Sequence, residues 1–327
     1  MNKQMLKILV FTFFFISGFC WNIYSDNPLD LDHDGMPDSW ETTYGLNPSI
    51  NDADNDADND SLSNINEFRN NSYPNTQDSD NDGLLDGEEA IHFGSEFQIN
   101  SYTLGSQHHP KVASNGTNYF VTWIDDSRDG NDSGIFGQLL DLNGDEIGSE
   151  FQINSYTTGE QSGQFIASNG TNYFLAWQSS GQDGSYRGIY GQLYNLNGAK
   201  IGSEFKVNTH TSNYQELPFI ASNGSNYFVT WRSKEQDGDG YGIYGQLYDL
   251  NGTKIDSEFR INSYTSNDQR YQSIASVDNY YLVTWSSNGQ DGSGYGVYGQ
   301  LYNSTGAKIG SEFHISTHTL NNQSNFL

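Results

Sequence analysis

The chain has 327 residues and a formal net charge of −27, with 41 acidic residues against 14 basic ones. Binding to nucleic acid or to an anionic membrane surface needs clustered Lys and Arg, so this charge argues against both kinds of partner. The one cysteine, Cys20, excludes a disulfide framework within the chain.

Residues 1–20 have the pattern of a signal peptide. A short basic region, MNKQMLK, precedes the apolar run ILVFTFFFISGF, and Gly18 and Cys20 are small residues at −3 and −1 of a cleavage site before Trp21. The run is too short to span a bilayer. The alternative is a lipoprotein anchor at Cys20, against which stands the bulky Phe19. The sequence therefore predicts a secreted or cell-surface protein without stable membrane insertion.

Three copies of one acidic pattern follow, reading DLDHDGMPDSWE, DADNDSLSNINE and DSDNDGLLDGEE. Each has Asp at positions 1, 3 and 5, Asp or Asn at 9 and Glu at 12, which is the ligand order of a twelve-residue calcium loop. The carbonyl of position 7 contributes to the shell of roughly six to eight oxygens around calcium. The expected calcium ligands are Asp30, Asp32, Asp34, Met36, Asp38 and Glu41, then Asp56, Asp58, Asp60, Leu62, Asn64 and Glu67, then Asp78, Asp80, Asp82, Leu84, Asp86 and Glu89.

Charge density also favours a bound cation. Residues 26–89 hold 18 acidic residues and one basic residue, Arg69. Two carboxylates about 4 Å apart repel by about 1 kcal/mol in water and by about 4 kcal/mol at an intermediate dielectric, and a divalent ion removes this repulsion. The alternative is a disordered acidic linker. The second copy has an overlapping register from Asp52, but that register ends at Ser63, so the register ending at Glu67 is preferred.

The series D-x-D-x-D-G-x-x-D, with the connectors YGLNP and RNNSYPNTQ, resembles bacterial thrombospondin type 3 calcium repeats. Short helix-like patches such as SWETTYGL and INEFRN follow the ladders, and apolar residues are few. The resemblance covers the segment 21–91 and implies extracellular calcium binding, with calcium holding together a segment that has a small core.

From residue 92 to residue 327 the sequence repeats every 54 residues. Each unit reads as four strands, and in the second unit QFIASNGTNYFLAWQ and GIYGQLYNLNGAKIGSEFKVN are two hairpins about Asn-Gly turns, which predicts a four-stranded antiparallel sheet. Apolar residues on both faces of strands such as NYFLAW indicate a sheet buried on both sides. The predicted fold is therefore mainly β, with blades in a propeller-like array after a small calcium-loop segment with short helices; the alternative is a linear array of small β-domains.

The number of blades is unusual. The sequence holds a lone GSEFQIN segment from Gly94, four complete units and a tail, THTLNNQSNFL, that begins another unit. Either four blades close tightly or the ring is incomplete. The motifs QDGSGYG and GIYGQ are similar to repeats of large secreted bacterial surface proteins.

Glu150, Asp183 and Gln192 recur in other units, which indicates structural roles, so side chains that break the repeat are the better candidates for function. These are His108, His109, Asp125, Asp126, Arg187, Lys234 and Glu235. They do not form a recognisable set of nucleophile, base and orienting group. Repeated tyrosines (Tyr190, Tyr194, Tyr244 and Tyr248) offer stacking faces to sugars, but packing within blades is the favoured role.

These observations predict a protein that is not an enzyme. The expected function is a secreted or cell-surface calcium-binding structural or adhesion protein, in which a calcium-stabilised stalk presents a β-repeat head to glycans or surface proteins. The alternative is a secreted carbohydrate-active enzyme or lectin with its site on the propeller.

Overall fold

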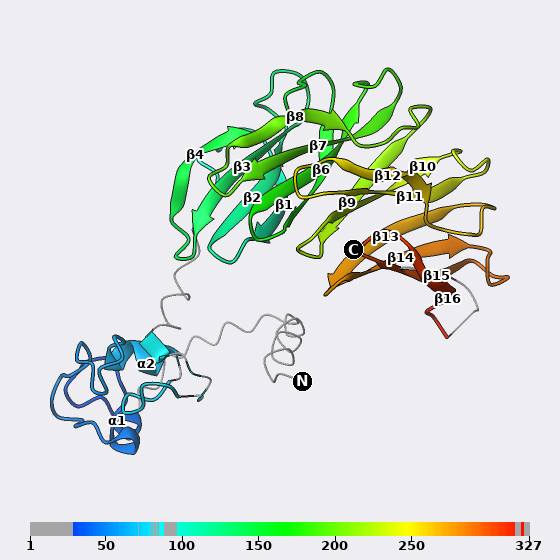
Figure 1. The fold of residues 1–327 in the computed structure, drawn as a ribbon. Helices are drawn as coiled ribbons and strands as arrows, with labels where there is room; N and C mark the ends of the chain where they lie inside the picture. The colour runs from blue at the N-terminus through cyan, green and yellow to red at the C-terminus, as the bar shows by residue number, and fades with distance from the viewer. Residues whose placement is uncertain are drawn as a thin grey trace. The chain divides into compact units, whose positions relative to one another are not determined.

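The computed structural model describes residues 29–70, 72–79, 81, 83, 85–87, 97–317 and 322–323 (Figure 1). The chain divides into two compact units, which we call unit 1 (residues 1–95) and unit 2 (residues 96–327). The predicted signal peptide and Cys20 lie outside the described residues. Within the described ranges, no helix combines the length and the apolar character needed to cross a membrane.

Two short helices are defined among the described residues of unit 1, α1 (Asp38–Tyr44) and α2 (Asn64–Asn70), within irregular loops. Helix α1 ends at Gly45, whose positive φ of 80° allows its backbone N–H to bond to the carbonyl of Glu41. The apolar core is one small cluster: Met36, Ala53 and Ile65, with Trp40, Leu46 and Phe68 packed against it. Hydrophobic burial therefore contributes little to the stability of this unit.

The described part of unit 2 is built from four antiparallel sheets of four strands each, and we call these sheets blades 1 to 4. Blade 1 consists of β1 (Gln107–Ser114), β2 (Asn118–Asp125), β3 (Gly134–Asp141) and β4 (Glu146–Gln152), and blade 2 of β5 (Gln161–Ser168), β6 (Asn172–Ser180), β7 (Arg187–Asn195) and β8 (Lys200–Lys206). Blade 3 consists of β9 (Gln215–Ser222), β10 (Tyr227–Lys234), β11 (Tyr241–Tyr248) and β12 (Lys254–Arg260), and blade 4 of β13 (Gln269–Val277), β14 (Tyr280–Asn288), β15 (Tyr295–Asn303) and β16 (Lys308–His314).

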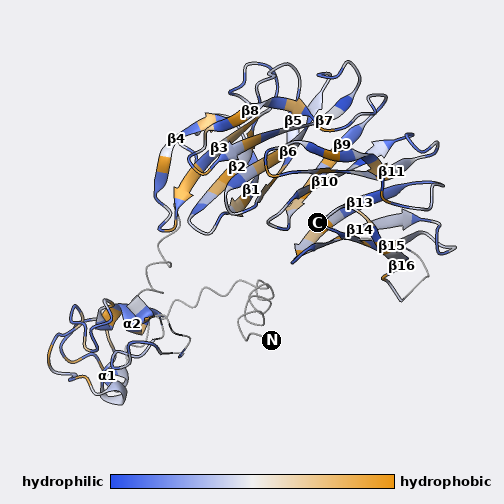
Figure 2. Cartoon of the chain, viewed as in Figure 1, coloured by the Kyte–Doolittle hydropathy of each residue, from blue (hydrophilic) through white to orange (hydrophobic). Residues whose placement is uncertain are grey.

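The strand pattern confirms the predicted mainly-β, propeller-like fold. In blade 2, the turns at Gly170 and Gly198 both have positive φ and join β5 to β6 and β7 to β8. Strand β6 is buried on both faces, because Tyr173, Phe174 and Leu175 are all inaccessible to solvent. Figure 2 shows the apolar residues of unit 2 concentrated in its strands.

Neighbouring blades pack face to face in chain order. Separate apolar cores join blade 1 to blade 2, blade 2 to blade 3 and blade 3 to blade 4. At the first of these interfaces the Tyr173 hydroxyl donates to the Asn118 carbonyl at 2.9 Å, and the same bond recurs one repeat later from Tyr227 to Asn172. The 54-residue period therefore encodes both the blade and the contact between blades.

The first strand of each blade carries a bulge at one repeat position. His109, Gly163, Leu217 and Tyr271 have positive φ angles of 53°, 62°, 52° and 55°. In all four blades the pairing with the second strand shifts register at this point. The bulges turn side chains of β1, β5, β9 and β13 into one common cavity, described below.

Candidate functional site

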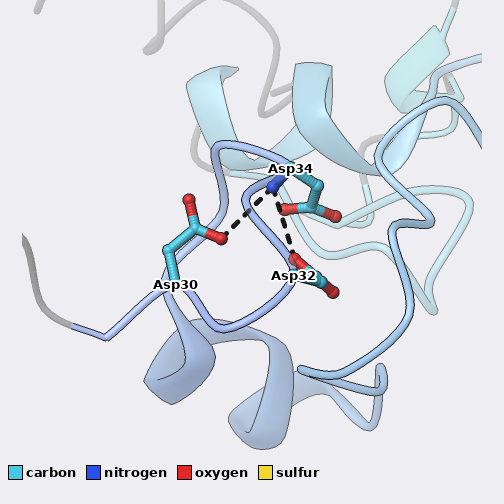
Figure 3. A group of neighbouring side chains, drawn as sticks. All are labelled: Asp30, Asp32 and Asp34. Atoms are coloured by element: carbon cyan, nitrogen blue, oxygen red, sulfur yellow. Dashed lines mark hydrogen bonds between the residues drawn. The ribbon is translucent and has the colours of Figure 1, made fainter.

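Carboxylates of unit 1 gather in clusters whose ligand oxygens lie within 4.8 Å of one another. Four such groups occur among the described residues: Asp30, Asp32 and Asp34; Asp34, Glu41 and Asp52; Asp56, Asp58 and Asp60; and Asp60, Glu67 and Asp86. Figure 3 shows the first cluster, in which the Asp34 N–H donates to Asp30 at 3.2 Å and to Asp32 at 3.3 Å. The loop thus brings alternate carboxylates to one point, as a cation loop does.

Several of these buried oxygens have no hydrogen-bond partner. Both carboxylate oxygens of Glu41, of Glu67 and of Asp58 are in this state. Burial, together with Asp32 and other nearby aspartates, raises the pKa of Glu41 to about 7. Burial, together with Asp58 and Asp60, raises the pKa of Glu67 to about 8. A site of unpaired oxygens that resists ionisation without a counter-charge fits a hard divalent cation.

The clusters join residues from different acidic ladders. Asp52 lies outside the preferred register of the second ladder, yet it meets Asp34 and Glu41 of the first. Asp86 of the third ladder meets Asp60 and Glu67 of the second. Two of the four clusters are therefore shared between ladders rather than contained in single twelve-residue loops.

The third ladder docks closely on the second. The Gly87 N–H donates to the Asp60 carboxylate at 2.9 Å, and a Cβ at Gly87 would lie 2.2 Å from the Asp60 carbonyl oxygen. Only glycine fits at this close approach.

The remaining predicted ligands take other places. Asp38 accepts the Leu31 N–H at 2.8 Å, and the Asn64 side chain donates to the Asp52 carbonyl at 3.0 Å. The backbone N–H groups of Met36 and Leu62 donate to Asp34 and Asp60. Asp78 accepts the Gly83 N–H at 2.9 Å. Asp80, Asp82, Leu84 and Glu89 lie outside the described residues.

Unit 2 has a cavity of about 780 Å³, which is within the usual range for small-molecule sites. Three carboxylates line it, from Asp126, Asp132 and Glu160, together with apolar groups and two histidines. The apolar and basic lining includes Phe165, Phe219, Tyr271, His108, His109 and Lys111. Many of the residues that line the cavity are not repeated: the equivalent positions of the other units hold different residue types.

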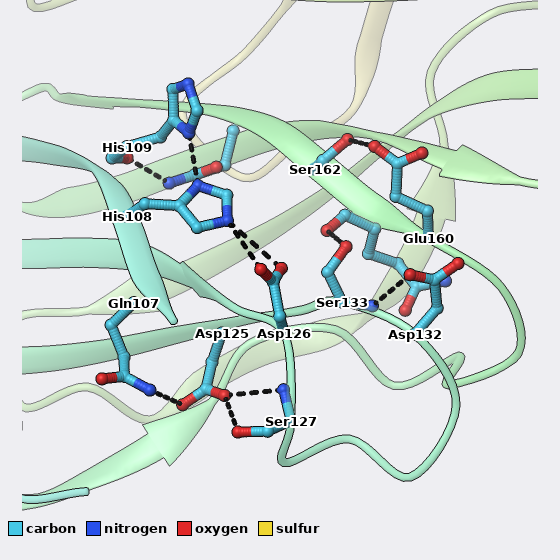
Figure 4. A network of polar contacts seen from close by, with 12 residues as sticks. Gln107, His108, His109, Asp125, Asp126, Ser127, Asp132, Ser133, Glu160 and Ser162 are labelled. Carbon is cyan, nitrogen blue, oxygen red and sulfur yellow. Dashed lines mark hydrogen bonds and ion pairs between the residues drawn. The ribbon is translucent and has the colours of Figure 1, made fainter. Parts of the chain in front are cut away.

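His108 and Asp126 form the best-defined polar pair of the cavity. Figure 4 shows the His108 ring directed at the Asp126 carboxylate, with its Nε2 atom 3.2 Å from both oxygens. The other ring nitrogen lies 2.5 Å from the His109 ring. The pairing with a carboxylate favours a proton on Nε2 of His108. Two of the predicted candidates therefore face one cavity together.

A second polar group connects the cavity to neighbouring blades. The Arg187 guanidinium donates to Glu160 at 2.7 Å and to Glu216 at 3.1 Å. Glu216 also accepts from Arg232 at 2.8 Å and from the Tyr241 hydroxyl at 2.9 Å. Burial would raise the pKa of Glu216, but Arg232 and these hydrogen bonds outweigh burial and lower it. The network fixes the Glu160 side chain at the cavity wall.

The sequence-based candidates divide between the cavity and other places. Asp125 is buried in an ion pair with Arg128 at 3.0 Å, and Glu235 accepts from Asn213 at 3.1 Å. The Lys234 ammonium lies over the Tyr241 ring. The tyrosines considered as sugar platforms are buried in the apolar cores between blades, which agrees with the favoured packing role: Tyr190, Tyr194, Tyr244 and Tyr248.

No family model and no curated protein matches the chain. Among solved structures it is similar to a subtype N10 neuraminidase-like protein of A/little yellow-shouldered bat/Guatemala, at 13% identity over 63% of this chain and 59% of that chain, with a TM-score of 0.39. An α-L-arabinofuranosidase from Lactobacillus brevis shares 10% identity over 62% of this chain and 72% of its own, with a TM-score of 0.39. An endo-arabinase from Bacteroides thetaiotaomicron shares 14% identity over 68% of this chain and 85% of its own, with a TM-score of 0.37.

The prediction that the protein is not an enzyme is contradicted by the comparisons, because the similar solved structures include two arabinofuranosidases and an endo-arabinase. Repetition misled the prediction, because repeated positions build the blades while His108, His109 and Asp126, which break the repeat, line one cavity. The low identities and TM-scores concern the fold and assign no reaction to this chain.

Proposed function

We propose that the protein is carbohydrate-active, with a glycan bound in the 780 Å³ cavity of unit 2, and that unit 1 is a calcium-binding module. The observation that supports the first half is the gathering of repeat-breaking polar residues around one cavity. The second half is supported by the shared carboxylate clusters. Both halves fit a secreted or cell-surface protein, since extracellular calcium is abundant enough to fill modules of modest affinity.

The lining of the cavity suits a sugar. Carboxylates accept hydrogen bonds from hydroxyl groups, and His108 donates or accepts according to its tautomer. Gln164 is buried, lines the cavity and has a side-chain oxygen without a partner, so it offers another acceptor. The rings of Phe165 and Phe219 lie 4.0 Å apart and present apolar surface on which the C–H face of a sugar ring can pack.

Glycan binding is tested with the full chain in millimolar calcium, first on a glycan array that includes arabinose-containing and sialylated sugars. His108→Ala and Glu160→Gln remove two separate polar groups of the cavity, and we expect each to weaken binding by about tenfold or more, as loss of a hydrogen bond to a charged group does. Glu235→Gln is the matched control, because Glu235 is exposed and does not line the cavity.

Hydrolysis of the bound glycan is followed on the same samples by release of reducing sugar. Turnover that disappears with Glu160→Gln would make the protein a glycosidase, which uses paired carboxylates. Absence of any glycan ligand, or affinity unchanged in both cavity variants, would refute the proposal for unit 2.

Calcium binding by unit 1 is tested by calorimetric titration of the full chain after treatment with EDTA. Heat of binding that saturates near millimolar calcium is expected, because extracellular modules bind at roughly 10⁻⁴ to 10⁻³ M. No heat at about 5 mM calcium would refute this half and leave the glycan proposal standing.

A further inference from the structure

The outer face of blade 4 exposes positions that are buried in blades 1, 2 and 3. Leu139, Leu193 and Leu247 are 1%, 1% and 2% exposed, whereas their counterpart Leu301 is 36% exposed. Ile153, Val207 and Ile261 are fully buried, whereas Ile315 is 43% exposed. Phe313 and Ile309 are exposed on the same blade. In blades 1, 2 and 3 the equivalent apolar residues are covered by the next blade, whereas in blade 4 they form an exposed apolar surface.

The three covered faces show what fits such a surface. A Cβ at Gly198 would lie 2.5 Å from Leu139, one at Gly252 2.6 Å from Leu193, and one at Gly306 2.7 Å from Leu247. In each case the leucine of one blade lies on the turn glycine of the next blade. The partner for Leu301 is therefore the starting face of another blade, with glycine at this turn.

Blade 1 has the one starting face among the described blades that no complete blade covers. Tyr173, Tyr227 and Tyr281 are fully buried at the interfaces, whereas their counterpart Tyr119 is 38% exposed. The turn glycine of blade 1, Gly144, is also present.

A short segment occupies part of the starting face of blade 1. Phe97 lies 3.0 Å from a Cβ built at Gly144, and Ile99 packs against the apolar cluster of blade 1. The Ser101 N–H donates to Glu150 at 3.0 Å, as the Ser155 N–H does to Glu204 at the next interface. Residues 97–101 thus stand in the place of the outer strand of a preceding blade.

We propose that blade 4 of one copy docks on blade 1 of a second copy, with Phe313 and Ile315 displacing Phe97 and Ile99 from that face. The contact continues an interface that the chain already forms three times. It does not rest on the glycan or calcium proposals. Such a head-to-tail contact is heterologous, so it forms either a closed ring or a longer assembly.

The proposal predicts opposite effects for changes at the two ends. Leu301→Glu places a charge in the new interface and should abolish association. Phe97→Ser removes the ring that packs at Gly144, so it weakens the segment that competes for blade 1 and should strengthen association. Val277→Glu is the matched control, because Val277 is exposed on β13 and its repeat counterparts Asn169 and Asn223 belong to none of the apolar cores between blades.

Sedimentation velocity of the full chain in calcium, over a wide range of concentrations, measures the assembly. Circular dichroism checks that each variant is folded. Association that Leu301→Glu removes, Phe97→Ser enhances and Val277→Glu leaves unchanged supports the proposal. A monomer at every concentration, including that of Phe97→Ser, overturns it, and so does association that is insensitive to Leu301→Glu; the first of these results is expected if blade 4 closes on blade 1 of its own chain.

Discussion

Replacing Glu67 by Gln provides the sharpest test of the cation sites. Glu67 is fully buried, and neither of its carboxylate oxygens has a hydrogen-bond partner. Its pKa in the metal-free fold is raised from 4.5 to about 8 by burial and by Asp58, Asp60 and Asp86. At about 1.4 kcal/mol for each pKa unit, ionising Glu67 in the metal-free fold would lower the free energy of unfolding by at most about 5 kcal/mol, and solvent screening makes the real loss smaller.

The sign of the pH dependence follows from this shift. Between pH 4.5 and about 8 the folded, metal-free unit holds a proton on Glu67 that the unfolded chain has lost. The free energy of unfolding of the metal-free unit therefore falls as pH rises through this window. Calcium reverses the trend, because the cation binds the ionised carboxylate and its binding releases the proton.

Glu67→Gln should act in opposite directions in the two states. In EDTA the variant loses the part of the pH dependence that Glu67 contributes, while that of Glu41 remains, and it is more stable than the parent at pH 8 because position 67 no longer needs to ionise. In calcium it loses a ligand, and we expect affinity to fall by about tenfold or more. Scanning calorimetry of the full chain at pH 5 and pH 8, with and without calcium, measures both effects.

Asp54→Asn is the matched control, since it removes the same charge from an exposed residue outside the four clusters. Equal behaviour of the two variants would show that general charge density, not a built site, determines the response. Calcium affinity of Glu67→Gln equal to that of the parent would refute the assignment of Glu67 as a ligand.

Two further predictions concern the blades. Gly191→Ala should destabilise unit 2 by about 1 to 3 kcal/mol, because the new Cβ would lie 2.6 Å from the Phe174 ring; the thermal unfolding transition of unit 2 measures this loss. Tyr173→Phe should cost about 1 kcal/mol through loss of its hydroxyl bond to the neighbouring blade. Tyr119→Phe, at the same repeat position with an exposed ring, should change the transition little, and an equal loss in both variants would contradict the assigned bond.

The blades could be predicted because the turn residues and the apolar pattern of the strands indicate the same fold. The Asn-Gly turns set the hairpins, and the apolar residues on both faces of NYFLAW require a neighbour on each side. The small size of the unit 1 core was also visible in advance, since Trp40, Ile65 and Phe68 are among its few apolar residues.

The cavity was predictable only in part. His108 and Asp126 were recognised because they break the repeat, but Glu160 and Glu216 were missed although they carry the same signal. The position of Glu160 holds Ser, Tyr and Asp in the other units, and that of Glu216 holds His, Ser and Arg. Comparing the repeats position by position would have found both residues. Their contact through Arg187 depends on the packing of blades 2 and 3, which the period alone does not specify.

Some carboxylate clusters of unit 1 combine residues from outside one acidic pattern, so no single twelve-residue register predicts all of the cation sites. A twelve-residue template assigns each carboxylate to one loop, and it leaves Asp52 out of the preferred ladder. In the fold, Asp34 and Asp60 each belong to two clusters, and Asp52 and Asp86 each complete a cluster of another ladder. Since a cation at a shared cluster would connect two ladders, occupying one site should favour its neighbour. Calcium would then replace the missing apolar core as the link between successive loops.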